Sequence, residues 1–258
     1  TLPHVVQKLA SMIGRPNVSA EEIGTLLEKD QVLSAKVLRL ANSPFYGFPS
    51  RIASVAHAVV VLGLNVVKGL TLCATAFDMM RNAGMNELWR HSLGVAMTAH
   101  ILGTKAAMKN PEEVFVAGLL HDIGKVVLYV KWPDVGQQIT TVTRNTSRPL
   151  MDTEQELFEV THADVGGWLA SAWHLPTSLR EPILHHHTPA AAQDAKLQTA
   201  IVHVADVLVK GLACGNPGDD LVPPLSRQAW DLVGLDAQSR AHCLTQATEE
   251  FQTIDDYL

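Results

Sequence analysis

Residues 115–125 read Phe115-Val116-Ala117-Gly118-Leu119-Leu120-His121-Asp122-Ile123-Gly124-Lys125 and place two adjacent ionisable side chains inside an apolar, helix-like stretch. A carboxylate removed from water needs a cation or strong hydrogen-bond donors as partners. An imidazole nitrogen beside a carboxylate oxygen is a ligand pair that divalent metals accept. The stretch therefore predicts a polar site inside a helical core, and it directs attention to the other His, Asp and Glu residues.

Composition favours a compact, helix-rich protein. The chain has 258 residues, of which 47% are hydrophobic, 18% charged and 5% aromatic. The net charge of -6, without a Lys/Arg cluster, argues against a nucleic-acid partner. No apolar run approaches the roughly 20 residues that span a bilayer, and no basic-then-apolar leader is present, so we expect no membrane partner and a cytoplasmic location. Three widely separated cysteines, Cys73, Cys214 and Cys243, fit reduced thiols.

Helical periodicity recurs along the whole chain. Ser19 and Glu22 form a capping-box pattern that predicts a helix over 20–29, and Asp30 is expected to cap a second helix that ends near Asn42. Further helices are expected over 54–62, 65–81, 85–107, 111–130, 133–144, 153–160, 162–173, 177–187, 194–213 and 237–253. No strand-like alternation persists, so the predicted fold class is all-α.

The order of these segments predicts a two-lobed helical bundle. Residues 1–82 are expected to form an N-terminal helical lobe, packed on a helical core of residues 83–212. A loop and a C-terminal helical extension would occupy 213–258. Because the chain starts at Thr1 and enters a helical pattern almost at once, we expect it to be a piece of a longer protein with an upstream domain.

Candidate metal ligands occur on five separate predicted helices. Besides the 121–122 pair, they comprise Glu87 and His91, four residues apart on one helix face, then His162, the triplet His185 to His187, and Asp206. Helical bundles assemble metal sites from inward-facing side chains of several helices. Two readings stay open: these groups bind metal, or they form a metal-free network of hydrogen bonds and ion pairs. In the second reading, His203 is the partner of Asp206.

The order of motifs resembles the HD phosphohydrolase superfamily. The residues that carry this resemblance are Trp89-Arg90-His91-Ser92, then residues 118–125, then a lone His, a His pair and an Asp. In the first half, the helix beginning at Asp30 with Val37-Leu38-Arg39-Leu40-Ala41-Asn42-Ser43, and the later run from Ala58 to Gly63, resemble the HDOD domain, the HD-related output domain of bacterial signalling proteins. Residues 1–212 would be this domain.

The resemblance to the related HD-GYP enzymes implies a metal site whose ligands are the residues at the matching positions of this sequence. The implied ligands are Glu87, His91, His121, Asp122, His162, His186, His187 and Asp206, with His185 as an alternative within the triplet. Two divalent ions would be held when the site is filled, and Fe, Mn, Zn, Ni and Mg all remain open. Asp122 and Lys125 are the residues assigned to catalysis, Lys125 through a phosphate contact.

One departure from the HD-GYP pattern limits the functional expectation. Those enzymes follow their His pair with a Glu and a Gly-Tyr-Pro motif that engages a cyclic dinucleotide, whereas this chain continues with Thr188, Pro189 and three alanines. The expected function is therefore a signal-transduction output or regulatory module that retains a metal site but is not a dedicated cyclic-di-GMP phosphodiesterase. Its partners would be a signalling protein and an upstream receiver or sensor domain.

Two alternatives compete with this expectation. One is a metal-dependent phosphohydrolase acting on a nucleotide or phosphoester, favoured by the near-complete ligand set. The other is a nucleotide-binding sensor that keeps the pocket but has lost turnover. The sequence leaves open whether the chain is an enzyme, although it leans towards a regulatory module.

Overall fold

The computed structural model describes residues 19–43 and 50–252, and every regular element within these ranges is helical. The first helices are α2 (Ala20–Glu28), α3 (Gln31–Ala41), α4 (Val55–Leu62) and α5 (Leu64–Asn82). The central ones are α6 (Asn86–Lys105), α7 (Pro111–Leu120), α8 (Ile123–Lys131), α9 (Pro133–Thr146) and α10 (Leu150–Phe158). The chain ends with α11 (His162–Ala172), α12 (Thr177–His185), the short 3₁₀ helix η2 (Pro189–Ala191), α13 (Lys196–Gly211), α14 (Arg227–Val233) and α15 (Ala237–Phe251). The all-α prediction is confirmed.

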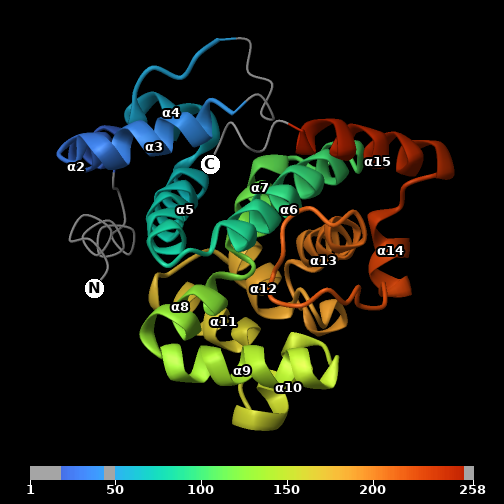
Figure 1. Cartoon of the computed structure of the whole chain (residues 1–258). Helices are drawn as coiled ribbons and strands as arrows, with labels where there is room; N and C mark the ends of the chain where they lie inside the picture. The colour runs from blue at the N-terminus through green and yellow to red at the C-terminus, as the bar shows by residue number, and fades with distance from the viewer. Residues whose placement is uncertain (1–18, 44–49, 253–258) are drawn as a thin grey trace.

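The N-terminal lobe begins with the two predicted helix caps. Ser19 Oγ accepts a hydrogen bond from the Glu22 amide at 3.1 Å, and Asp30 Oδ1 accepts one from the Leu33 amide at 3.0 Å. Each cap satisfies an amide that the first helical turn leaves without a partner. Helices α2, α3 and α4 pack against one another, and α5 runs beneath them towards the core (Figure 1).

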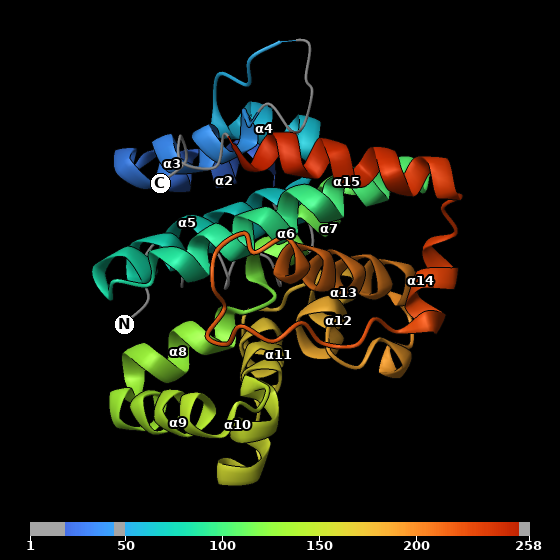
Figure 2. The same ribbon diagram turned by 45° about the vertical axis from the view of Figure 1, so that its right-hand side comes forward.

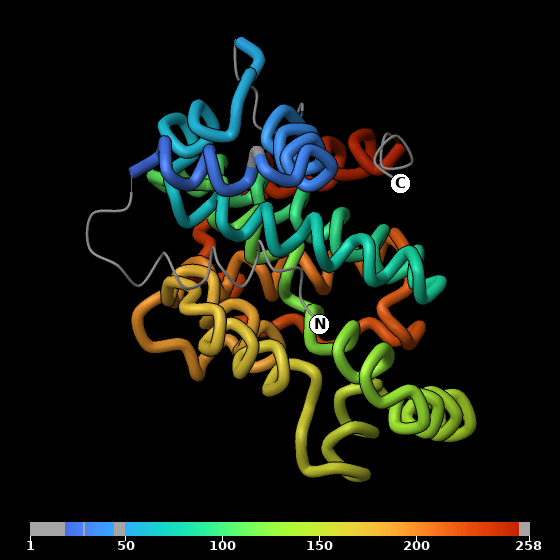
Figure 3. The backbone as a smooth tube through the Cα atoms, turned by 90° about the vertical axis from the view of Figure 1, so that its left-hand side faces the viewer, coloured from blue at the N-terminus to red at the C-terminus, as the bar shows by residue number. Residues whose placement is uncertain are grey.

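Helices α6, α7 and α13 form the centre of the larger lobe. Nearly the whole of α6 is buried, because α7, α13 and α15 all pack against it. Helices α11 and α12 pack together and contact α8 and α7, respectively. In all three views, α9 and α10 lie at the end of the molecule opposite α2, α3 and α4 (Figures 1, 2 and 3). The two-lobed arrangement places the chemistry-bearing stretch in the middle of the larger lobe.

Two local predictions need correction. The helix expected over 111–130 is two helices, because α7 ends at Leu120 and α8 begins at Ile123. Apolar residues lie on both sides of the break, so periodicity alone gives no sign of it. The short helix α14 was also not expected. Its N-cap, Ser226, accepts a hydrogen bond from the Ala229 amide.

Two further findings bear on the composition argument. Cys73, Cys214 and Cys243 are all free thiols, as predicted. Within the described part of the chain, no helix combines the length and the apolar character that crossing a membrane requires. The division of the chain at residues 82 and 212 stays a prediction.

Candidate metal centre

The break between α7 and α8 turns the two ionisable residues of the opening stretch into the centre of the site. His121 follows the last residue of α7, and Asp122 precedes the first residue of α8. Both side chains are 1% exposed. The His121 Nδ1–H donates to the Gly118 carbonyl at 2.7 Å, which leaves Nε2 as the ring nitrogen that faces the interior. Asp122 Oδ2 lies 3.2 Å from this Nε2 and accepts a hydrogen bond from Lys125 Nζ at 2.8 Å.

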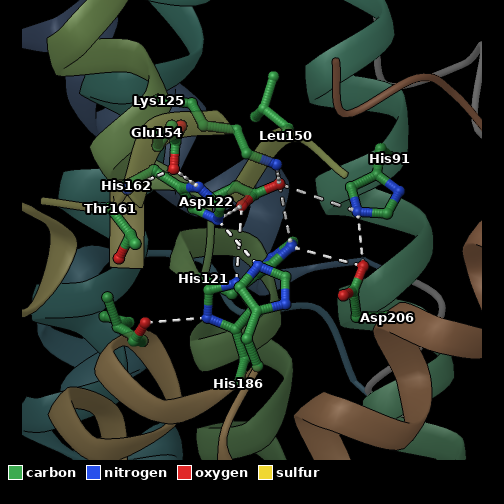
Figure 4. A network of polar contacts seen from close by, with 12 residues as sticks. His91, His121, Asp122, Lys125, Leu150, Glu154, Thr161, His162, His186 and Asp206 are labelled. Atoms are coloured by element: carbon green, nitrogen blue, oxygen red, sulfur yellow. Dashed lines mark hydrogen bonds and ion pairs between the residues drawn. The ribbon is translucent and has the colours of Figure 1, made fainter. Parts of the chain in front are cut away.

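His162 enters the site through the first turn of α11. Thr161 and Asp164 form a capping box that starts this helix, as Thr161 Oγ1 accepts from the Asp164 amide and the Thr161 amide donates to Asp164 Oδ2. The His162 Nδ1–H donates to the buried Glu154 carboxylate at 2.6 Å, and the His162 amide donates to the same oxygen at 2.8 Å. His162 Nε2 is thereby aimed at Asp122 Oδ1, 3.2 Å away (Figure 4).

The turn after α12 supplies two more imidazoles. The His186 Nδ1–H donates to the Ile183 carbonyl at 2.9 Å, and His186 Nε2 lies 3.8 Å from Asp122 Oδ1. His187 Nε2 lies 3.0 Å from His162 Nε2, so a proton or a shared ion must separate these two nitrogens. His186 and His187 are therefore the two members of the triplet that face the interior, and His185 belongs to none of the ligand groups found among the described residues.

Helices α6 and α13 close the site from the opposite side. His91 Nε2 on α6 lies 3.0 Å from Asp206 Oδ1 on α13 and 3.9 Å from Asp122 Oδ2. Asp206 Oδ1 is also 3.9 Å from His121 Nε2, and both His91 and Asp206 are buried (Figure 4). Of the eight polar residues predicted to converge on a common interior point, the structure brings seven together.

Three overlapping groups of donor atoms lie close enough to hold ions. In each group, one ligand atom per residue lies within 4.8 Å of the others, and the groups are His91 with His121 and Asp206, His121 with Asp122 and His186, and His162 with His186 and His187. Glu87 is in none of them. It is exposed on the first turn of α6, so the structure does not bring this predicted ligand to the other seven.

Charge inside the cluster is strongly coupled. Burial alone would raise the pKa of Asp122, but His121 and Lys125 outweigh it and hold that pKa well below its ordinary value. The pKa of Asp206 is also lowered, since its contact with His91 outweighs burial. Burial lowers the pKa of His186 well below its ordinary value, and neighbouring imidazoles lower it further. Burial alone would lower the pKa of His121 and of His162, but Asp122 and Glu154 outweigh it and raise both, so a metal would have to displace protons from these two rings.

The donor set fits a divalent ion. His121, His162 and His186 each have Nδ1 fixed by an oxygen acceptor, and such a hydrogen bond orients the opposite ring nitrogen towards a metal. His121 Nε2, His186 Nε2 and Asp122 Oδ1 are fully buried without a hydrogen bond, although each lies within 4 Å of an oppositely charged or ionisable group. A metal is the partner that satisfies several inward lone pairs at once.

Sequence reasoning missed one residue of the site and misjudged another. Glu154 is one of three acids in α10, and spacing does not distinguish it from exposed Asp152 and Glu156. His203 is not the partner of Asp206 in the structure: its Nδ1–H donates to the His186 carbonyl instead, while His91 contacts Asp206.

A cavity of about 620 Å³ adjoins the cluster. Its lining includes Lys125, Glu87 and Thr143, together with Arg144 on α9 and Asp219 on the extended segment between α13 and α14. This volume lies within the range of small-molecule sites. Glu87 thus lies at the cavity beside the cluster rather than among the clustered ligands.

Comparisons with known proteins agree with this architecture. The HDOD domain family model matches residues 1–189. An HDOD domain protein of unknown function from Geobacter sulfurreducens is 28% identical, with a TM-score of 0.76, over 100% of this chain and 93% of that one. A Shewanella amazonensis protein, provisionally described as a phosphohydrolase, has the same fold at 23% identity and a TM-score of 0.70, over 100% of this chain and 94% of that one.

A curated relative from Treponema pallidum, itself uncharacterised, is 25% identical over 260 residues, which cover 98% of this chain. This chain spans 50% of that relative's length. The HDOD family match covers the helices that carry the cluster residues up to His187. Helix α13, which carries Asp206, lies beyond the end of that match. The chain belongs to the HDOD domain family.

Proposed function

We propose that this chain is the regulatory module of a bacterial signalling protein and that it binds divalent metal at the cluster around Asp122. The observation that carries the proposal is the convergence of seven donor residues, six of them buried, among which His91 Nε2, His121 Nε2, His186 Nε2 and Asp122 Oδ1 lack a hydrogen bond. Leaving such atoms unsatisfied costs about 1–3 kcal/mol each, which metal binding would offset. A divalent ion in such a site acidifies a bound water and neutralises phosphoryl oxygens.

The output of this module would be a surface offered to a signalling partner. The N-terminal lobe exposes apolar side chains that soluble proteins usually cover, among them Val32 on α3 and Val60 and Val61 on α4. The relative of twice this length supports a neighbouring domain in the parent protein, and a receiver or sensor domain is the kind we propose.

Cyclic-di-GMP hydrolysis is not part of the proposal. After His187 the chain forms the turn Pro189–Ala191, with alanines where HD-GYP enzymes carry their Gly-Tyr-Pro motif. We therefore expect purified protein loaded with Mn²⁺ or Fe²⁺ to leave cyclic-di-GMP intact.

Elemental analysis tests the proposal. Protein purified without chelator, or supplied with micromolar Mn²⁺, Co²⁺, Zn²⁺ or Fe²⁺, should retain one to two ions per chain. His121→Ala should lose at least one of them, whereas the exposed His242→Ala should not. Wild-type protein that holds no ion under these conditions would contradict the proposal.

The cavity beside Lys125 favours a second candidate function, hydrolysis of a nucleotide or phosphoester. Lys125 lines the cavity and pairs with Asp122 of the cluster, and Arg144 provides an exposed cation in the same lining. Metal-loaded protein would then release phosphate or a nucleotide, and both Lys125→Met and Arg144→Ala would lower the rate. The exposed Arg227→Ala supplies the control. Ligand-dependent melting without product would instead indicate a nucleotide sensor.

A further inference from the structure

We propose that His203 is a positioning residue that joins the turn carrying His186 and His187 to the extended segment 212–226, so that metal binding and the seating of this segment depend on each other. The inference rests on the proposed metal site but goes beyond it. It assigns a role to α13 and the segment after it, which follow the part of the chain that the family match covers.

Both nitrogens of the His203 ring are engaged. Nδ1 lies 2.7 Å from the His186 carbonyl oxygen, which only accepts, so Nδ1 carries the hydrogen. Nε2 lies 2.9 Å from the Ser226 amide, which only donates, so Nε2 provides a lone pair. These two contacts select one neutral tautomer of a side chain that is only 4% exposed. His203 is therefore not free to bind a metal, although Asp206 lies one turn away.

The first hydrogen bond fixes a ligand-bearing turn to α13. Asp206 projects from α13 into the cluster, while His203 holds the backbone of His186 from the same helix. Helix α13 thereby sets the separation between Asp206 and His186, which approach the cluster from different sides. A displacement of the turn on metal binding would have to move the His203 ring or break this bond.

The second hydrogen bond ends a segment that also touches the other side of the site. Gly215 packs so closely on α6 that an added Cβ would lie 2.3 Å from the His91 amide nitrogen, and the Asn216 amide donates to the Glu87 carbonyl at 3.1 Å. Asp219 then accepts from the Leu150 amide and from Lys210. Figure 2 shows the segment looping out beside α6 and returning past α13 to α14.

The segment is thus connected to the two walls of the cluster, at the backbone of His91 and, through His203, at the backbone of His186. It also forms a wall of the cavity, to which Asp219 and Leu221 contribute. Changes at the metal centre would reach this outer wall and α14, which begins directly after Ser226.

Three substitutions separate the two hydrogen bonds. In H203N the amide nitrogen can occupy the place of Nδ1, which keeps the donor to His186 and loses the acceptor for Ser226. In H203Q the amide oxygen can occupy the place of Nε2, which keeps the acceptor and loses the donor. H203F loses both at similar volume. H242Q, at an exposed histidine of α15, is the matched control.

Titration with Co²⁺, followed by its visible absorption bands, reports affinity and ligand geometry. Outer-shell partners of metal ligands typically contribute 10–100-fold in affinity. We expect H203F and H203Q to bind Co²⁺ at least about tenfold more weakly, H203N to restore most of the affinity lost in H203F, and H242Q to match the wild type. Co²⁺ affinity and spectrum unchanged in H203Q and H203F would overturn the proposal.

Hydrogen exchange tests the coupling itself. In the wild type, Co²⁺ should slow amide exchange at Ser226 and along 212–226, whereas in H203N the metal still binds but this slowing is lost. Equal slowing in H203N and wild type would overturn the proposal. Wild-type protein that binds no Co²⁺ would contradict the proposed metal site as well, whereas binding that the variants leave unaltered contradicts the role of His203 alone.

Discussion

The buried carboxylate of Glu154 shows how much a single side chain contributes to the site without facing its centre. One oxygen accepts two hydrogen bonds from His162, from the ring and from the amide. The contact fixes the His162 tautomer, so Nε2 is presented to Asp122 and His187. An imidazole without this anchor would be held less firmly in one orientation and tautomer and would lose part of its affinity for a metal.

Substitution of Glu154 should therefore weaken metal binding more than it weakens the fold. We expect Glu154→Gln to raise the dissociation constant for Co²⁺ or Zn²⁺ by about 10–100-fold, because the amide is a weaker acceptor for the His162 ring. The loss in free energy of unfolding should be about 1–3 kcal/mol, measured by urea denaturation without metal.

The neighbouring Glu156 gives a matched control for this prediction. It lies on the same helix but is exposed, where it pairs with Arg148. Glu156→Gln should change metal affinity by less than about twofold and stability by less than about 0.5 kcal/mol. Equal effects of the two substitutions would show that Glu154 does not orient His162.

At the scale of elements, the site depends on helices that approach unusually closely. Helix α8 crosses α11 at Gly124, where an added Cβ would lie 1.9 Å from the His162 carbonyl oxygen and 2.9 Å from the Gly166 amide nitrogen. Helix α7 crosses α6 at Gly118, where a Cβ would meet the backbone of Ala96 at 2.7 Å. These two glycines bring the elements that carry Asp122, His162 and His91 within reach of one another.

Gly124→Ala should consequently disturb both packing and metal binding. We expect a loss of about 1–3 kcal/mol in the free energy of unfolding, because the backbone of α11 cannot yield as a flexible side chain would. Metal affinity should also fall, as His162 moves with the helix. Chemical denaturation and metal titration of the same samples measure the two effects.

Gly211, the last residue of α13, offers the control. It has open space around it and no left-handed backbone, so Gly211→Ala should be neutral or stabilise by up to about 1 kcal/mol. A Gly124→Ala protein as stable as Gly211→Ala would show that the α8–α11 crossing tolerates a side chain.

The elements also show where sequence reasoning reaches its limit. The caps at Ser19 and Asp30, and most helical segments from 54 onward, followed from local patterns and were confirmed within a few residues, but the single helix over 111–130 was wrong and α14 was missed. The break after Leu120 could not be foreseen, since residues on both sides are apolar and the cause is tertiary. If α7 and α8 formed one straight helix, His121, Asp122 and Lys125 would not all face α11 and α13.

The sequence predicted most of the candidate site, as it predicted most of the helices. Seven side chains were found because imidazoles and carboxylates beside apolar residues are costly without partners. Glu87 was included because it shares a helix face with His91, yet it begins α6 at the surface. Glu154 and the partners of His203 were missed because hydrogen bonds to backbone atoms of distant segments leave no spacing in the sequence.

At the scale of the whole molecule, a buried lysine connects the two lobes. Lys68 on α5 is 1% exposed, and its Nζ donates to the carbonyl of His174 at 2.7 Å. His174 follows α11, so the bond joins the N-terminal lobe to the lobe that holds the cluster. Burial lowers the pKa of Lys68 from 10.5 to about 8.

This lowered pKa predicts that the junction becomes more stable in alkaline solution. Between about pH 8 and 10.5 the unfolded chain holds more protons on Lys68 than the folded chain, so the free energy of unfolding rises with pH. Below pH 8 both states are protonated, and the folded protein bears the full cost of the buried charge. Lys68→Met removes this contribution. The stability of the wild type relative to Lys68→Met should therefore increase by about 2 kcal/mol between pH 7 and pH 10.

Urea denaturation of both proteins at the two pH values measures this difference, because titrations common to both cancel. The exposed Lys196 on α13 provides the control, and Lys196→Met should differ from the wild type by an amount that changes by less than about 0.5 kcal/mol with pH. A pH-independent gap for Lys68→Met would mean that the amine is not confined between the lobes. A gap that moves the other way would mean that the hydrogen bond to the His174 carbonyl stabilises the charged amine more than burial destabilises it.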